Sequence, residues 1–115
     1  MNGVVGKMQR RAFSLKIKAG VKEEYKRRHD EIWPEMRQML ADAGLRNYSI
    51  WMMGDDMLFG YYETDDDDYA VRFQAESKIG QKWEAYMADM LETRTMPDGT
   101  VQPCKEALDM MFLQE

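Results

Sequence analysis

The sequence has very few residues of the kinds that build covalent or metal-based sites. Its 115 residues include one cysteine, Cys104, and one histidine, His29. A single cysteine cannot form an internal disulfide, and such low usage is typical of a reducing compartment. One histidine and one cysteine are also too few for a His/Cys zinc site within one chain. We therefore expect a cytoplasmic protein that has no disulfide framework and binds no metal.

Long apolar runs, basic stripes and nucleotide motifs are also missing. No apolar stretch approaches the roughly 20 residues of a membrane span, and residues 1–7 lack the apolar core of a signal peptide. With 16 Lys and Arg against 21 Asp and Glu, the net charge is -5, which argues against a large nucleic-acid footprint. We interpret the two densest basic runs, Arg10-Arg11 and Lys26-Arg27-Arg28, as solvated charge. The expected partners therefore include neither nucleic acid nor a membrane.

Known catalytic motifs are absent too, which limits the chemistry that the chain could perform. No glycine-rich phosphate loop is present, and no nucleophile-elbow pattern is found. The acidic run Asp65–Asp68 lacks the spaced ligands and the glycine of a calcium loop, so we interpret it as a helix N-terminus. A reaction that uses no metal, nucleotide or covalent intermediate would have to be a simple proton transfer.

Length and composition fit one globular domain with one core. Hydrophobic residues make up 44% of the chain and charged residues 32%. We interpret residues 1–7 as an N-terminal tail and residues 8–115 as a single domain. The sequence shows no internal repeat and no low-complexity linker.

The order of periodic segments predicts an α+β fold. Strands are expected at 11–18, 47–53, 57–63 and 108–113. Helices are expected at 21–29, from Pro34 to Gly44, after the acidic run, and after Ser77, with a loop at 96–103. The turn Gly54-Asp55-Asp56 joins the two middle strands as a hairpin. This order is the βαββαβ pattern of the ferredoxin-like fold, with one antiparallel four-stranded sheet that carries helices on one face.

The two hairpin strands carry apolar or aromatic residues on both faces. In the first of them Tyr48, Ile50 and Met52 alternate with Trp51 and Met53. A sheet with one face in water would show a cleaner alternation. We therefore expect the second face to be covered by a partner subunit, a ligand cavity, or both.

A short stretch gathers the groups best suited to proton transfer. Tyr25 and His29 are four residues apart, so they share one helix face, and Trp33 follows four residues later. Near neutral pH histidine can both give and take a proton. A surface histidine beside a packing tyrosine is the alternative. Trp33, which precedes Pro34, is either a structural corner residue or a flat wall for a sugar ring.

These residues belong to a longer stretch that resembles a known family. The segment Glu24-Tyr25-Lys26-Arg27-Arg28-His29-Asp30-Glu31-Ile32-Trp33-Pro34-Glu35 is similar to the signature of the L-rhamnose mutarotases. The likeness continues through Asn47-Tyr48-Ser49-Ile50, Leu58-Phe59-Gly60, Gln81-Lys82-Trp83 and Tyr86-Met87-Ala88-Asp89-Met90. It covers the chain from about Met8 to its end.

The resemblance implies a cytoplasmic homodimer with a dimeric α+β-barrel fold. It also implies an isomerase that interconverts the α and β anomers of a 6-deoxyhexose pyranose, most directly L-rhamnose, without a cofactor. In that family the histidine that matches His29 is the acid–base residue. The tyrosines that match Tyr25 and Tyr48 contact the sugar.

The resemblance extends to the last helix, where the family has a Trp-Trp pair that contacts the sugar. Trp83 matches the first member, but Glu84 stands at the second position. A carboxylate adds a hydrogen-bond acceptor and removes a stacking face, so L-fucose or another deoxyhexose is an alternative substrate. Trp83 and Trp33 are expected to wall the pocket near the C6 methyl group. The same fold could instead serve as a non-catalytic small-molecule-binding module, or as a cofactor-free oxygenase or haem-handling protein.

Overall fold

The computed structural model describes residues 7–115 and contains one four-stranded sheet, one small two-stranded sheet and a set of short helices. The strands are β1 (Gln9–Lys16), β2 (Arg46–Met53), β3 (Met57–Thr64), β4 (Thr93–Thr95), β5 (Val101–Pro103) and β6 (Lys105–Leu108). The helices are α1 (Lys22–Asp30), α2 (Pro34–Asp42), α3 (Asp67–Glu76), α4 (Lys78–Met87) and the 3-10 helix η1 (Ala88–Met90). Of the predicted N-terminal tail, residues 1–6 lie outside the described residues, and Lys7 is exposed before β1.

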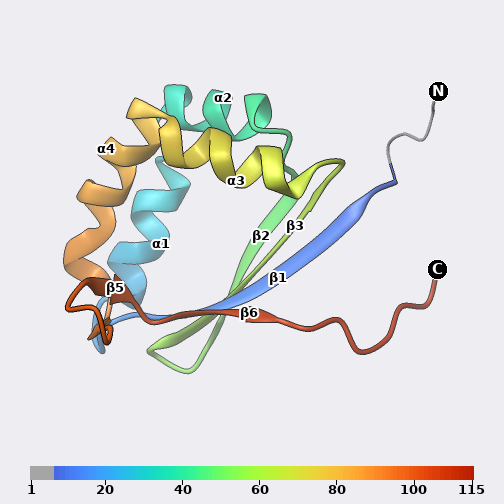
Figure 1. Ribbon diagram of the computed structural model, residues 1–115. Helices are drawn as coiled ribbons and strands as arrows, with labels where there is room; N and C mark the ends of the chain where they lie inside the picture. Colours follow the sequence, from blue (N-terminus) through green and yellow to red (C-terminus); the bar gives the residue numbers. More distant parts are fainter. Residues whose placement is uncertain (1–6) are drawn as a thin grey trace.

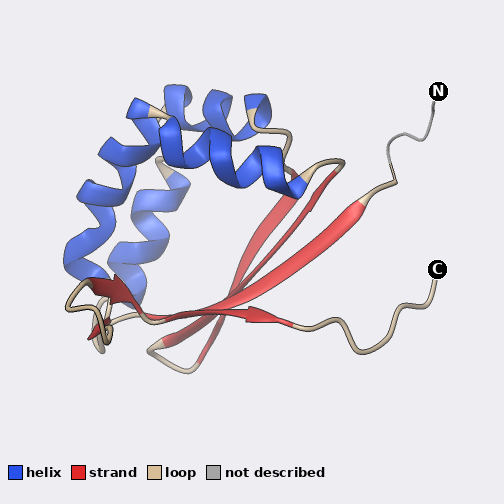
Figure 2. Ribbon diagram, viewed as in Figure 1, coloured by secondary structure: helices blue, strands red, loops and turns tan. Residues whose placement is uncertain are grey.

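The main sheet has the strand order β2-β3-β1-β6, and every neighbouring pair is antiparallel. Figure 1 shows all four α-helices on one side of this sheet, with α1 and α4 side by side. The opposite side carries no helix, as Figure 2 makes plain for the described part of the chain. The ferredoxin-like α+β fold with a four-stranded antiparallel sheet is therefore confirmed.

Local sequence signals explain where three of the helices begin. Trp33 is extended, with φ -61° and ψ 137°, and Pro34 then occupies the first turn of α2. The Asp66 carboxylate accepts a hydrogen bond from the Tyr69 amide at the start of α3, and the Ser77 hydroxyl accepts one from the Gly80 amide at the start of α4. The interpretation of the acidic run as a helix N-terminus is confirmed.

The predicted last strand is wrong in its position. The sequence pattern places it at 108–113, but β6 spans Lys105–Leu108 and pairs with the Ala12–Leu15 part of β1. Residues 109–115 form no helix or strand, and they run away from the helices (Figure 1). The apolar run that suggested a strand is mostly exposed: Met111 is 90% and Phe112 80% accessible. The predicted loop at 96–103 also differs, because its last residues form β5, which pairs with β4.

The core lies between the helix-facing side of the sheet and the helices. Leu58 on β3, Ile17 just after β1 and Met90 in η1 are almost completely buried. The outer side of the sheet presents different residues of the same strands. There Phe59 on β3 lies opposite Trp51 on β2, and Trp51 is 69% exposed. The expectation that the hairpin strands are apolar on both faces is therefore confirmed.

A bulge in β2 sets which of its residues face the helices. Arg46 pairs with Glu63 and Ser49 with Tyr61, so two residues of β2 oppose one residue of β3 between these pairs. Asn47 sits there with φ 51°, a left-handed conformation that asparagine tolerates well. Its side-chain amide donates to the Glu63 carboxylate over 2.7 Å. From Tyr48 onward alternate residues, namely Tyr48, Ile50 and Met52, face the helix side.

Candidate functional site

The site predicted from the sequence lies at a cavity of about 760 Å³ between α1, α2 and the edge strand β2. This volume is within the usual range for small-molecule pockets. Tyr25, His29 and Tyr48 all contribute to its wall. Apolar residues make up much of the remainder, namely Ile32, Leu40, Leu45, Ile50, Trp51 and Met52. Charged residues also contribute, namely Lys22, Glu23, Lys26, Asp30 and Arg37.

His29 is held in one tautomer by the turn of helix that precedes it. Its Nδ1 lies 3.1 Å from the backbone carbonyl oxygen of Tyr25. Because a carbonyl only accepts, Nδ1 carries the proton and donates it, and Nε2 keeps a free lone pair. Among residues 7–115, Nε2 makes no hydrogen bond. The neutral ring is thus prepared to accept a proton from a ligand.

The surroundings of His29 also favour its neutral form. Burial lowers the pKa of His29 below the ordinary 6.5, and this effect exceeds the opposing contributions of the Tyr25 carbonyl and of Asp30. On one side the imidazole stacks on the Tyr25 ring, with centroids 4.5 Å apart and an interplanar angle of 26°. His29 is thus half-buried at the edge of the cavity, with its ring packed on that of Tyr25.

Two phenols complete the cavity side of the site. Burial raises the pKa of Tyr25 well above its ordinary value, and the neighbouring Tyr48 raises it further. Burial of its hydroxyl raises the pKa of Tyr48 to about 12, although 39% of the residue surface remains open. Both phenols stay protonated near neutral pH, so each can donate a hydrogen bond to a ligand oxygen.

Trp33 and Trp83 lie on the other side of His29, away from the cavity. The Trp83 ring meets the imidazole edge-on, with centroids 5.4 Å apart at 89°. Trp33 meets Trp83 in the same way at 5.1 Å, and Tyr86 packs on both indoles at 5.2 and 5.6 Å. Neither indole belongs to the wall of the cavity. Such edge-to-face pairs add about 0.5–1.5 kcal/mol each to area burial. The cluster therefore supports the imidazole from behind.

Glu84 is placed differently from the other predicted site residues. It is exposed on α4 and does not belong to the wall of the cavity. The structure thus gathers Tyr25, His29 and Tyr48 around one space. It places Trp33 and Trp83 behind the imidazole and leaves Glu84 on the surface.

Sequence reasoning missed one residue next to the predicted site. From the sequence we interpret Arg28 as solvated charge, but the side chain of Arg28 is only 12% exposed. Arg28 donates a hydrogen bond to the backbone carbonyl of Tyr86 near the end of α4. Its neighbours in the run, Lys26 and Arg27, form ion pairs only with carboxylates in α1 or directly after it. Helical spacing carries a signal for this difference. Arg28 is rotated by about 100° from His29 and lies four residues after Glu24, with which it pairs over 2.8 Å.

The described residues offer little to hold a metal. Within residues 7–115 there is no group of three His, Cys, Asp or Glu side chains close enough to bind an ion. None of the helices in this part of the chain is long and apolar enough to cross a membrane.

Comparison with known proteins relates this chain to one family. A sequence-family model described as L-rhamnose mutarotase matches residues 10–113. The L-rhamnose mutarotase of Lachnoclostridium phytofermentans is 39% identical over 106 residues, which cover 91% of this chain and 97% of that protein. The L-rhamnose mutarotase of Listeria monocytogenes is 44% identical over 87 residues, which cover 75% and 83%.

Comparison with solved structures leads to the same family. The crystal structure of L-rhamnose mutarotase from Formosa agariphila has a TM-score of 0.76 and 34% identity, and the match covers 93% of this chain and 99% of that one. A dimeric ferredoxin-like protein from an uncultured marine organism, with a TM-score of 0.52 and 12% identity over 92% of this chain and 91% of that one, shares the fold alone. On this sequence and structural similarity, the chain belongs to the L-rhamnose mutarotase family.

Proposed function

We propose that this protein is an aldose mutarotase that interconverts the α and β anomers of L-rhamnose. Membership of the family supports this proposal. The observation that carries it is the state of His29, whose Nδ1 is fixed by the Tyr25 carbonyl and whose ring lies at a cavity of sugar-binding size. L-fucose and other 6-deoxyhexoses are the alternative substrates.

Mutarotation requires two proton transfers and one reversible bond cleavage. In our proposal Nε2 of His29 takes the proton of the anomeric hydroxyl group. The bond between C1 and the ring oxygen breaks, C1 becomes an aldehyde, and the ring oxygen receives a proton. After rotation about C1–C2 the steps run in reverse and close the ring on the other face. Positioned acid–base catalysis of this kind contributes on the order of 10² to 10⁴ in rate.

The neighbouring phenols would orient the sugar. Tyr25 and Tyr48 are protonated donors at the cavity, so each can hold a sugar hydroxyl or the ring oxygen in place. We propose that one of them relays the second proton. The contacts of Trp33, Trp83 and Glu84 with the sugar stay predictions.

We also propose that the enzyme works as a cytoplasmic homodimer. Support for the dimer comes from the outer side of the sheet, where Trp51 and Met53 are 69% and 62% exposed. A second copy packed there would remove this apolar surface from water. The cytoplasmic location is supported by the single cysteine.

Anomer exchange measured by NMR tests the proposed function. With wild-type protein, exchange between the α and β signals of L-rhamnose should exceed the buffer rate at micromolar enzyme. His29→Ala should lower this exchange by about 10² or more without loss of fold. Glu31→Gln, an exposed change just beyond α1, is the control and should retain the wild-type rate. Exchange at the buffer rate would overturn the proposal, and binding without faster exchange would instead indicate a binding module. The same assay with L-fucose measures sugar preference.

A further inference from the structure

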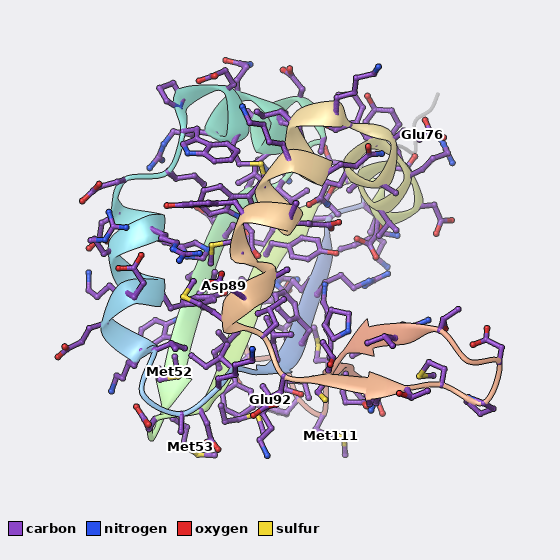
Figure 3. All side chains as sticks on the ribbon, turned by 90° about the vertical axis from the view of Figure 1, so that its left-hand side faces the viewer. Met52, Met53, Glu76, Asp89, Glu92 and Met111 are labelled. Carbon is purple, nitrogen blue, oxygen red and sulfur yellow. The ribbon has the colours of Figure 1, made fainter. Side chains whose placement is uncertain are left out.

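One arginine connects α1 to the end of α4 through several bonds at once. The Arg28 guanidinium donates through Nη1 to the backbone carbonyl of Tyr86 over 2.7 Å and to the Asp89 carboxylate over 3.0 Å. Its Nη2 donates to the other Asp89 oxygen over 3.3 Å, and its Nε donates to Glu24 over 2.8 Å. Figure 3 shows Asp89 beyond the C-terminal end of α4, near α1. The planar fork thus joins two helices that are far apart in sequence.

The same guanidinium also covers an aromatic ring. Its central carbon lies 4.5 Å from the centroid of the Tyr86 ring, which is the geometry of a cation–π contact. Arg28 therefore fixes Tyr86 twice, through its backbone oxygen and through its ring. The hydrogen bond from Arg28 also lowers the pKa of Asp89, so this carboxylate stays ionised.

Tyr86 in turn contacts the residues that hold the imidazole. Its ring packs on Trp33 and Trp83, and Trp83 meets His29 edge-on. Arg28 and His29 are neighbours on the same turn of α1. Their side chains are also connected through α4, because Arg28 contacts Tyr86, Tyr86 packs on Trp83, and Trp83 contacts His29. A loosened Tyr86 would leave Trp83 free to shift against the imidazole.

We propose that Arg28 is a positioning residue of the active site, which sets the orientation of the His29 ring by fixing Tyr86 and Trp83 against it. This inference rests on the proposed function for its catalytic consequence. Arg28 does not belong to the wall of the cavity, so it acts on the reaction through the aromatic cluster. Lysine cannot replace it, because an ammonium has neither the planar fork nor the face that covers Tyr86.

Two variants test the proposal, with one matched control. Arg28→Lys keeps the charge and removes the fork, and Asp89→Asn weakens the same link from the other end. Arg94→Lys is the control, because Arg94 also donates to a carboxylate, Glu106, and to a backbone carbonyl, that of Lys105, far from the site. The first readout is kcat and KM for anomer exchange. The second is the Hε1 chemical shift of His29, which is unambiguous because the protein has one histidine.

A displaced imidazole changes the chemical step more than sugar binding. For Arg28→Lys we expect kcat to fall roughly 10- to 100-fold with little change in KM, since misplacement of about 1 Å can cost that much. We expect the Hε1 signal to move, because the ring current of Trp83 acts on it. Asp89→Asn should show smaller changes in the same direction, and Arg94→Lys should show neither.

The two readouts separate this inference from the proposed function. A folded Arg28→Lys protein with unchanged kcat and an unmoved Hε1 signal would overturn the positioning role. A Hε1 shift in a protein whose wild type does not speed anomer exchange would uphold the structural link and reject the mutarotase. If Arg28→Lys does not fold, Asp89→Asn decides by the same two measurements.

Discussion

Gly60 lies in the middle of β3 at a place where no larger residue fits. The ring of Phe13, on the neighbouring strand β1, covers its Cα so closely that an added Cβ would lie 2.2 Å from Cζ and 2.4 Å from Cε1. Ordinary carbon–carbon contacts are about 3.5–4.0 Å. In Gly60→Ala the ring must therefore retreat by about 1.3 Å or more.

The cost of this change follows from what holds the ring. Phe13 packs against the core, and the Lys105 ammonium lies 4.5 Å from its centroid. Overpacking of a filled site costs about 1–3 kcal/mol. For a domain of this size, a loss of 1 kcal/mol lowers the unfolding midpoint by about 4 °C. We expect Gly60→Ala to lower Tm by about 4–12 °C.

Thermal unfolding followed by circular dichroism measures this loss, and a second substitution identifies its origin. In the background of Phe13→Leu, whose side chain is smaller, Gly60→Ala should cost clearly less than in the wild type. The two changes should therefore be non-additive. An unchanged Tm for Gly60→Ala alone, or the same loss in both backgrounds, would refute the steric argument.

Two further predictions concern His29 and the outer side of the sheet. Burial lowers the pKa of His29 in the folded state, so the unfolded chain binds this proton more readily. The free energy of unfolding should therefore decrease as pH falls below about 6.5. NMR titration of Hε1 should give a pKa below 6.5, and His29→Gln should remove this part of the pH dependence. A pKa at or above 6.5 would contradict the burial argument. Phe59→Glu places a charge opposite Trp51 on the outer side of the sheet. It should convert the proposed dimer to a folded monomer in sedimentation equilibrium, whereas the exposed change Glu31→Gln should leave the dimer intact. A wild-type protein that is already monomeric would exclude the dimer.

Much of the fold could be predicted because its signals are local. The Gly54-Asp55-Asp56 turn, Pro34 and Ser77 each fix one boundary through the geometry of a few neighbouring residues, and all three boundaries lie where the sequence predicts them. The last strand could not be placed in this way. The apolar residues at 110–113 signal contact with other apolar surface, but composition does not state where that surface lies.

The candidate site could be predicted in part for a similar reason. The spacing of Tyr25 and His29 places them on one helix face, and the structure stacks their rings. Tyr48 could be joined to them only by resemblance, because no local pattern relates β2 to α1. Arg28 escapes prediction because charge is usually solvated, and its partners at Tyr86 and Asp89 are about 60 residues away in sequence.

The bulge at Asn47 has a consequence for how this protein can vary in length. Side chains of a strand alternate between its two faces, so the extra residue reverses the odd–even order between the two halves of β2. Removal of Asn47 would close the bulge and leave residues 49–53 with their partners on β3, so the faces would not change. Removal of one residue between the bulge and the hairpin turn would instead exchange the side chains that reach the cavity for those on the outer side, Tyr48 included. A single-residue deletion after the bulge therefore acts as a change of active-site composition even though no side chain of the site is substituted, whereas the bulge itself can lose a residue without this effect.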